Sequence, residues 1–125
     1  MNGANGWWYE FQLKIANKLI FSKWREALGG NIQVIVSGGA PLQARLARIF
    51  SAAKLIVQEG YGLTETSPVI AVNKNHYPYL KFGTVGPLVE NIEVKIAADG
   101  EILMKGPSLM MGYYKDEKKT NEAID

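Results

Sequence analysis

The sequence predicts an α/β fold class, with a partial parallel βαβ sheet followed by an antiparallel, β-rich and barrel-like part. Three observations predict it: a long helical pattern opens the chain, two short apolar strands flank a second helix, and alternating strands around a tight turn fill the second half. The two parts meet at a polar loop. We therefore expect an α/β part in residues 1–73 and a β-rich part in residues 74–125.

The first helix is predicted from about Trp7 to Leu28. Apolar residues recur there at helical spacing and form a wide arc that we expect to be buried, whereas charged residues fall on the opposite side. Gly29 and Gly30 end the helix, because glycine readily adopts the left-handed conformation of a helix cap. Such an arc needs a partner surface, so we expect the chain on its own to self-associate.

A parallel strand–helix–strand unit is predicted next. Residues 32–36 and 55–57 are short apolar runs typical of buried strands, and residues 42–53 form an amphipathic helix with Pro41 near its first turn. Ligands bind such sheets beyond the carboxyl ends of the strands. The two glycine-bearing loops after the strands, residues 37–41 and 60–65, are therefore expected to line one crevice.

The second half has the signals of antiparallel structure. Residues 69–72 are a further predicted strand, and the polar loop after it carries the single histidine, His76, which we expect at the surface. Residues 92–96 alternate in polarity, the Asp99-Gly100 pair predicts a tight turn, and residues 101–105 return as the partner strand. A short helix capped by Asp116 is predicted to end the chain.

Composition excludes several classes of function. A net charge of +2 on 125 residues, with scattered basic residues, argues against a nucleic-acid partner. The chain has no cysteine, which excludes disulfides and thiolate metal sites and fits a cytoplasmic protein. No apolar run is long enough for a transmembrane segment. These features leave small molecules as the expected partners.

The residues with the clearest chemical potential lie between Glu59 and Pro68. Two glycines there let the backbone approach a ligand closely, and Tyr61 offers a flat aromatic face. A hydroxyl such as that of Thr64 can donate a hydrogen bond to a phosphate oxygen, and a carboxylate such as that of Glu65 can hold Mg²⁺. Taken alone, such a cluster is also compatible with a polar turn after a strand.

The run Tyr61-Gly62-Leu63-Thr64-Glu65-Thr66-Ser67 resembles the signature of the AMP-forming acyl-adenylate enzymes, which include acyl-CoA synthetases, adenylation domains and firefly luciferase. Three further regions are similar to motifs of that family in the same order: Val36–Leu42, then Gly83–Leu88 followed by Ile92–Ile96, and then Gly100–Gly106 with Gly112–Lys115. Residues 19–30 look most like the long-chain fatty acyl-CoA synthetases. The resemblance implies a fragment of the large N-terminal domain of such an enzyme.

That family joins a carboxylate to AMP, releases pyrophosphate and passes the acyl group to coenzyme A. The resemblance therefore implies ATP/AMP and Mg²⁺ as cofactors and coenzyme A as co-substrate, with a fatty acid as substrate. It also allows peripheral contact of the parent protein with the inner face of the membrane. The implied catalytic residues are Thr64, which would bind the phosphate, and Glu65, which would hold the metal.

The same resemblance implies two groups of binding residues. The nucleotide group, in which Tyr61 would lie against the adenine, consists of Gly39, Ala40, Pro41, Glu59, Gly60, Tyr61, Gly62 and Thr64. The acyl-channel group consists of Gly38, Gly62 and Leu63, where the absent glycine side chains would leave room for an aliphatic chain.

Several family motifs are missing from these 125 residues. The Ser/Thr- and Gly-rich phosphate loop, the Thr-Gly-Asp motif for the ribose and the small C-terminal domain with its lysine are absent, so we expect the fragment alone to be inactive. An adenylating enzyme for an aryl or amino acid remains an alternative. A non-catalytic nucleotide-binding or scaffold domain is another, although it would have no need to keep both Thr64 and Glu65.

Overall fold

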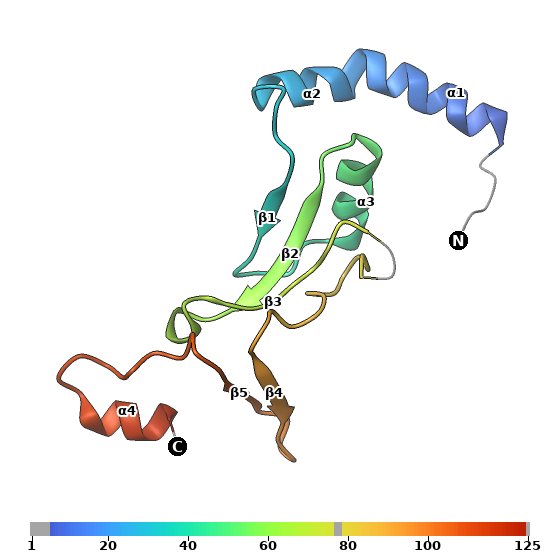
Figure 1. The fold of residues 1–125 in the computed structure, drawn as a ribbon. Coiled ribbons are helices and arrows are strands. Elements are labelled where there is room, and N and C mark those ends of the chain that lie inside the picture. Colours follow the sequence, from blue (N-terminus) through green and yellow to red (C-terminus); the bar gives the residue numbers. More distant parts are fainter. Residues whose placement is uncertain (1–5, 77–78, 125) are drawn as a thin grey trace.

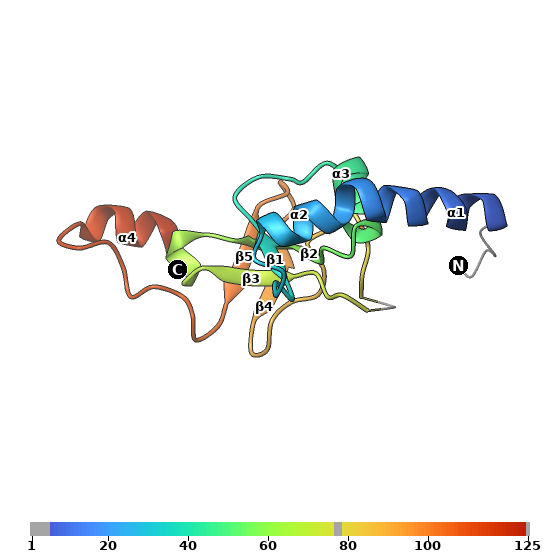
Figure 2. The same cartoon turned by 90° about the horizontal axis from the view of Figure 1, so that it is seen from above.

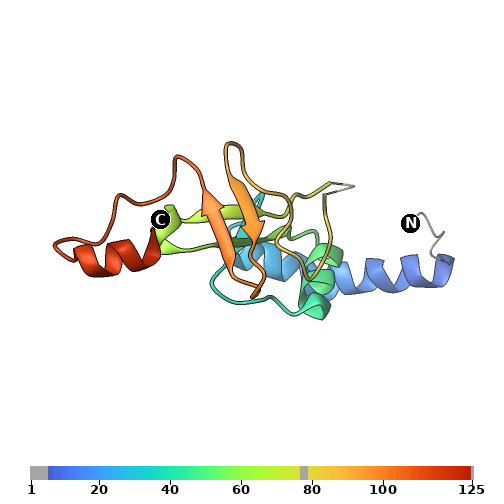
Figure 3. The same cartoon turned by 90° about the horizontal axis from the view of Figure 1, so that it is seen from below.

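The computed structural model describes residues 6–76 and 79–124. Figure 1 shows a helical run along one side of a small three-stranded sheet, with a β-hairpin and the last helix at the other side. Figures 2 and 3 agree that the first and last helices lie at opposite ends of an elongated molecule. The predicted α/β class is confirmed.

The N-terminal run is continuous and consists of α1 (Trp7–Ala16), a π-helical turn (Asn17–Phe21) and α2 (Ser22–Ala27). It ends at Gly29 and Gly30, whose φ angles of 87° and 75° fit the predicted left-handed cap. The helix prediction is therefore confirmed in extent, with a π-turn at its centre that the periodicity does not reveal.

The prediction that this helix buries its apolar arc is wrong for the described part of the chain. No residue of α1, the π-turn or α2 is buried, and the Trp7 side chain is 78% exposed. The run contacts the rest of the fold near its end, where the Trp24 ring lies 6.4 Å from that of Phe50 and Arg25 donates a hydrogen bond to the Ala53 carbonyl oxygen. Figure 1 shows the run along one side of the sheet, and most of the large apolar side chains of the arc are exposed, among them Trp8, Phe11 and Leu19.

The parallel βαβ unit is confirmed. β1 (Ile35–Ser37) pairs in parallel with β2 (Val57–Gly62), and α3 (Ala44–Ala52) connects them. β3 (Val69–Val72) pairs antiparallel on the other side of β2, which gives the order β1-β2-β3. The buried apolar core gathers around this unit and consists of Ala47, Ala53, Leu55, Ile70, Ala71 and Ile92.

Three details of the predicted unit are wrong. β1 is shorter than predicted and not buried, since the Val36 side chain is 62% exposed beside the unpaired edge of the sheet. α3 begins only at Ala44, so Pro41 lies before its first turn. Residues 59–62 are predicted as the start of a loop, but they belong to β2, because Gly60, Tyr61 and Gly62 pair with β3.

The chain then makes a long excursion and returns to the same sheet. It leaves β3 at Val72 and comes back at Leu88, which forms a bridge with Ala71; the Val72 and Val89 amides donate to the Pro87 and Ile70 carbonyl oxygens. His76 is exposed in this excursion, as predicted. The predicted β-rich part thus begins by pairing with the sheet of the first part.

The predicted hairpin is confirmed, but no closed barrel forms in residues 6–76 and 79–124. β4 (Glu93–Ile96) and β5 (Ile102–Lys105) pair antiparallel as a separate two-stranded sheet, with Gly100 in the turn at a φ of 94°. α4 (Glu117–Ala123) follows, and the Asp116 side chain caps it by accepting a hydrogen bond from the Lys119 amide. None of the helices in the described ranges combines the length and apolar character needed to cross a bilayer.

Candidate functional site

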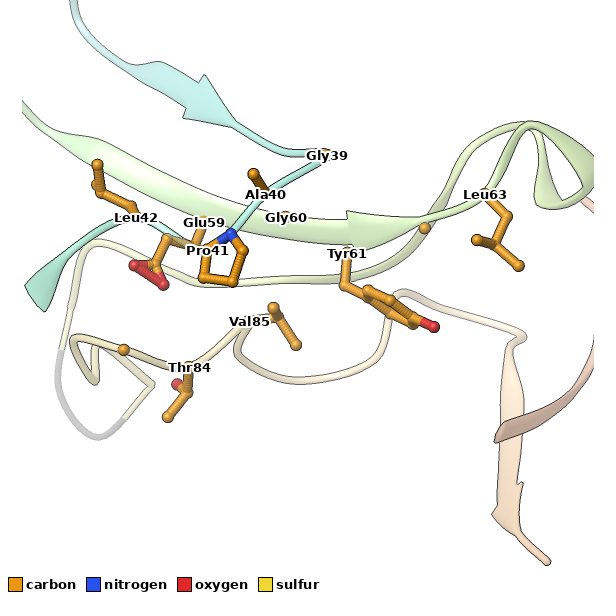
Figure 4. A pocket seen from close by; sticks show the side chains of 12 residues that line it. Gly39, Ala40, Pro41, Leu42, Glu59, Gly60, Tyr61, Leu63, Thr84 and Val85 are labelled. Atoms are coloured by element: carbon orange, nitrogen blue, oxygen red, sulfur yellow. The ribbon is translucent and has the colours of Figure 1, made fainter. Parts of the chain in front are cut away.

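A pocket of about 450 Å³ lies alongside the C-terminal half of β2. This volume is in the range of small-molecule sites. Three segments that are far apart in the sequence form its walls: the turn after β1, the strand β2, and the loop near residue 84 (Figure 4). The lining residues are Gly39, Ala40, Pro41, Leu42, Glu59, Gly60, Tyr61, Gly62, Leu63, Gly83, Thr84 and Val85.

The pocket brings together most of the residues that the sequence singled out. Residues 39–41 and 59–63 come from two separate motifs, and all of them line it. The expected crevice exists, although its second wall is a strand and not a loop. Gly38, Thr64 and Glu65 are not among the lining residues: Gly38 lies against the Gly60 carbonyl, and Thr64 and Glu65 follow the pocket end at Leu63.

Two pocket-lining side chains of β2, those of Glu59 and Tyr61, point to one side of the strand. Glu59 and Tyr61 are two residues apart, so they project to the same face, toward the loop that carries Thr84 and Val85 (Figure 4). Glu59 is only 8% exposed, and its Oε1 atom is buried without a hydrogen-bond partner among the described residues. A buried acceptor of this kind is costly unless a donor reaches it, which suits a ligand with N–H groups.

Asn73 holds the third wall of the pocket in place. This residue is 2% exposed, and its backbone amide donates to the Glu59 carbonyl oxygen at 2.8 Å. Its side-chain nitrogen donates to the carbonyl oxygens of Lys81 and Thr84 at 3.0 and 3.1 Å, and its side-chain oxygen accepts from the Lys81 amide. One buried amide therefore ties the loop to β2.

The turn after the pocket is folded tightly on itself. Thr64–Thr66 forms a single 3₁₀ turn, and the buried Thr66 hydroxyl lies 2.7 Å from the Pro68 carbonyl oxygen while accepting from the Leu63 amide. A β-carbon at Gly62 would overlap the Pro68 carbonyl. The glycine is thus required by the close approach of two backbone segments, and not only by space for a ligand.

Glu65 is held by a distant segment. The Tyr113 hydroxyl donates a hydrogen bond of 2.8 Å to its Oε1 atom, and the Met110 amide donates to its carbonyl oxygen. A hydrogen bond from the backbone at Glu65 and the bond from Tyr113 together lower the pKa of the Glu65 carboxyl from its ordinary value of 4.5. The same bond raises the pKa of the Tyr113 hydroxyl. Glu65 is therefore ionised and Tyr113 is neutral near pH 7.

Sequence reasoning missed several residues of this region. Leu42, Gly83, Thr84 and Val85 line the pocket, although the sequence placed them in a helix and a strand motif. Tyr113 was also missed as the partner of Glu65. The small residues after the polar loop could have indicated that this segment lines a pocket. Nothing in a single sequence connects position 113 to position 65.

Glu65 is the candidate metal ligand of this region. The described residues contain no group of three or more His, Cys, Asp or Glu side chains that could hold a metal ion. A single carboxylate such as Glu65 suits Mg²⁺, because that ion keeps several waters and is usually bound by one or two carboxylates together with phosphate oxygens.

The chain is similar to known acyl-activating enzymes. It is 45% identical over 110 residues to the long-chain-fatty-acid–CoA ligase FadD15 of Mycobacterium bovis, a match that covers 88% of this chain and 18% of the relative. It is 36% identical over 140 residues to long chain acyl-CoA synthetase 3 of Arabidopsis thaliana, covering 98% of this chain and 20% of that protein. The chain thus spans about a fifth of the length of these relatives.

Solved structures give the same result. A long-chain-fatty-acid-CoA ligase (FadD1) from Archaeoglobus fulgidus matches with a TM-score of 0.62 and 26% identity over 73% of this chain and 22% of its own. The O-succinylbenzoate coenzyme A synthetase of Bacillus subtilis, solved with AMP, matches with a TM-score of 0.64 and 26% identity over 75% of this chain and 21% of its own. The family model "AMP-binding enzyme" matches residues 5–114, so the chain belongs to the AMP-binding enzyme family.

Proposed function

We propose that this chain is part of a long-chain-fatty-acid–CoA ligase, which activates a fatty acid with ATP to acyl-AMP and pyrophosphate and then forms acyl-CoA. The observation that carries the proposal is the pocket, in which two family motifs from separate parts of the chain meet along β2. The similarity to the named long-chain ligases of Mycobacterium and Arabidopsis supports the fatty acid as the substrate.

The nucleotide base would occupy the pocket along β2. Its lining is largely apolar, with backbone from residues 39–41 on one side and Tyr61 available to lie against the flat base. The buried Oε1 atom of Glu59 lacks a partner among the described residues and would accept a hydrogen bond from the exocyclic amine of adenine. The orphaned acceptor thus fits the proposed ligand.

The phosphate end of the nucleotide would lie beyond Leu63. Thr64 is exposed there and would donate its hydroxyl proton to a phosphate oxygen, while the ionised Glu65 would bind Mg²⁺. Bound Mg²⁺ supplies the positive charge that offsets the charge on the phosphoryl oxygens. Gly38, Gly62 and Leu63 would border the acyl channel next to the same end of the pocket.

The test is ATP–pyrophosphate exchange that depends on added acid, measured on the complete gene product that contains this chain. We expect exchange with long-chain fatty acids, a loss of about 10²-fold or more in Glu65→Gln, and no loss in the matched surface variant Glu90→Gln. Equal exchange in wild type and Glu65→Gln would contradict the metal-binding role of Glu65.

The acid is the second question that this assay answers. An aryl-acid ligase is the other candidate, because the structures similar to this chain include the O-succinylbenzoate enzyme at 26% identity. Exchange with aryl or amino acids but not with fatty acids would support that candidate. No exchange with any acid would favour a nucleotide-binding or scaffold domain.

A further inference from the structure

Two separate contacts tie Glu65 to one segment near the end of the chain. The Tyr113 hydroxyl binds the Glu65 carboxylate at 2.8 Å, and the Met110 amide binds the Glu65 carbonyl oxygen at 2.8 Å. Side chain and backbone of the same residue are thus both fixed by residues more than forty positions away. A surface glutamate without such contacts would sample several rotamers.

Tyr113 is itself anchored to the last helix. Its backbone amide donates to the Thr120 hydroxyl oxygen at 2.9 Å, and that hydroxyl donates in turn to the Asp116 carbonyl oxygen. Gly112 permits this approach, because a β-carbon there would lie only 2.7 Å from the Thr120 methyl carbon and its φ is 139°. The backbone of Tyr113 is therefore fixed by contacts with the last helix, and its side chain approaches Glu65 from this fixed backbone.

The hydrogen bond from Tyr113 leaves one of the two Glu65 carboxylate oxygens available to bind a cation. Tyr113 donates to Oε1, and the second oxygen, Oε2, has no partner among the hydrogen bonds of the described residues. The bond is stronger with an ionised acceptor and requires a protonated donor, so it lowers the pKa of Glu65 and raises that of Tyr113.

We infer that Tyr113 is a positioning residue for Glu65, which it holds in one orientation for the divalent cation of the proposed reaction. This inference rests on the proposed function. Its physical basis is preorganisation: a ligand that is already oriented loses less conformational freedom when the cation arrives. Groups that orient a metal ligand in this way typically change metal affinity or activity by about 10–100-fold when they are removed.

The first experiment measures the Mg²⁺ dependence of acid-dependent pyrophosphate exchange in the complete gene product. We expect Tyr113→Phe to raise the Mg²⁺ concentration for half-maximal exchange by about 10-fold, with most of the maximal rate recovered at saturating Mg²⁺. Tyr114→Phe is the matched control, because this neighbour is 88% exposed, and we expect it to behave as wild type. An unchanged Mg²⁺ profile in Tyr113→Phe would overturn the inference, as would an equal loss at every Mg²⁺ concentration.

The second experiment separates failure of the inference from failure of the proposed function. The pKa of the Glu65 carboxyl is followed by NMR of the ¹³C-glutamate-labelled 125-residue chain. We expect the Glu65 pKa to rise in Tyr113→Phe and to stay unchanged in Tyr114→Phe. Identical Glu65 titrations in wild type and Tyr113→Phe would refute the contact itself. A shifted titration in the 125-residue chain, combined with no exchange activity in the complete gene product, would refute the cation role and the proposed function together.

Discussion

The pocket region and the N-terminal helical run differ in how many of their side chains are buried and contacted by other parts of the chain. Around β2, buried polar groups such as Asn73 and Thr66 find partners within the chain, and three distant segments meet. Along α1, the π-turn and α2, no residue is buried and large apolar side chains stay exposed. The difference teaches that the walls of the pocket are built by segments of this chain, whereas no described residue covers most of the helical run.

The largest effect on stability is expected from Gly62→Ala, which would disturb the backbone at the end of the pocket. The added methyl would overlap the Pro68 carbonyl, so either the turn or the β2–β3 pairing must move. We expect a loss of more than about 3 kcal/mol in the free energy of unfolding, measured by urea denaturation followed by circular dichroism.

Gly60→Ala is its matched control on the same strand. A β-carbon there would make ordinary contacts, 3.6 Å from a Val36 methyl and 3.8 Å from the Ala71 carbonyl oxygen. We expect a change within about 1 kcal/mol. Equal losses in the two variants would mean that the turn does not approach Gly62 as closely as the structure has it.

Asn73→Ala is expected to have the next largest effect. It would leave the carbonyl oxygens of Lys81 and Thr84 without their side-chain donor and free one pocket wall. The expected loss is about 1–3 kcal/mol in the free energy of unfolding. Asn75→Ala, two residues away and exposed, should cost almost nothing. If both variants unfold at the wild-type urea concentration, Asn73 does not organise the loop.

Asp116→Ala tests a local contact outside both regions. The Asp116 carboxylate accepts the Lys119 amide at the start of α4. Its loss should cost about 1 kcal/mol or less, and it should lower helical content only slightly. A thermal melt followed by circular dichroism measures the loss of stability. A loss larger than that of Asn73→Ala would contradict the expected order of the two effects.

The smallest effect on stability is expected on the helical run. Replacing the exposed Trp8 and Leu19 with Gln should change the free energy of unfolding by about 0.5 kcal/mol or less, because neither side chain is buried. The same double variant should shift the chain from oligomer to monomer in light scattering, since the apolar arc is the predicted self-association surface. Lys14→Gln on the polar face serves as control. A wild-type chain that is already monomeric would contradict this prediction.

Much of the fold and part of the site could be predicted from the sequence. The period of apolar residues predicted the helical run, and the order of strands and helix predicted the parallel unit, because both signals are local. The Asp99-Gly100 turn and the Asp116 cap were likewise predicted from local chemistry. The residues of the pocket that lie in the two glycine motifs were predicted by the family resemblance.

The errors arise where tertiary contacts decide the outcome. Residues 57–62 read as a strand end and a loop, yet β3 extends the strand through both glycines by pairing with it. The burial of the helical arc depends on a surface that the described residues do not supply. The contact between Tyr113 and Glu65 joins two distant positions, and no periodicity or spacing in one sequence carries that information.

The return of the chain to the sheet at Leu88 has a consequence for tolerance to insertions. Because the segment between Val72 and Pro87 leaves and rejoins β3 at fixed points, its two ends are already held together by backbone hydrogen bonds. Lengthening a closed loop costs only about 0.6 kcal/mol for each doubling. Extra residues after the exposed Lys74 should therefore lengthen the excursion without shifting the strands, which makes this position suitable for a peptide tag or a fluorophore.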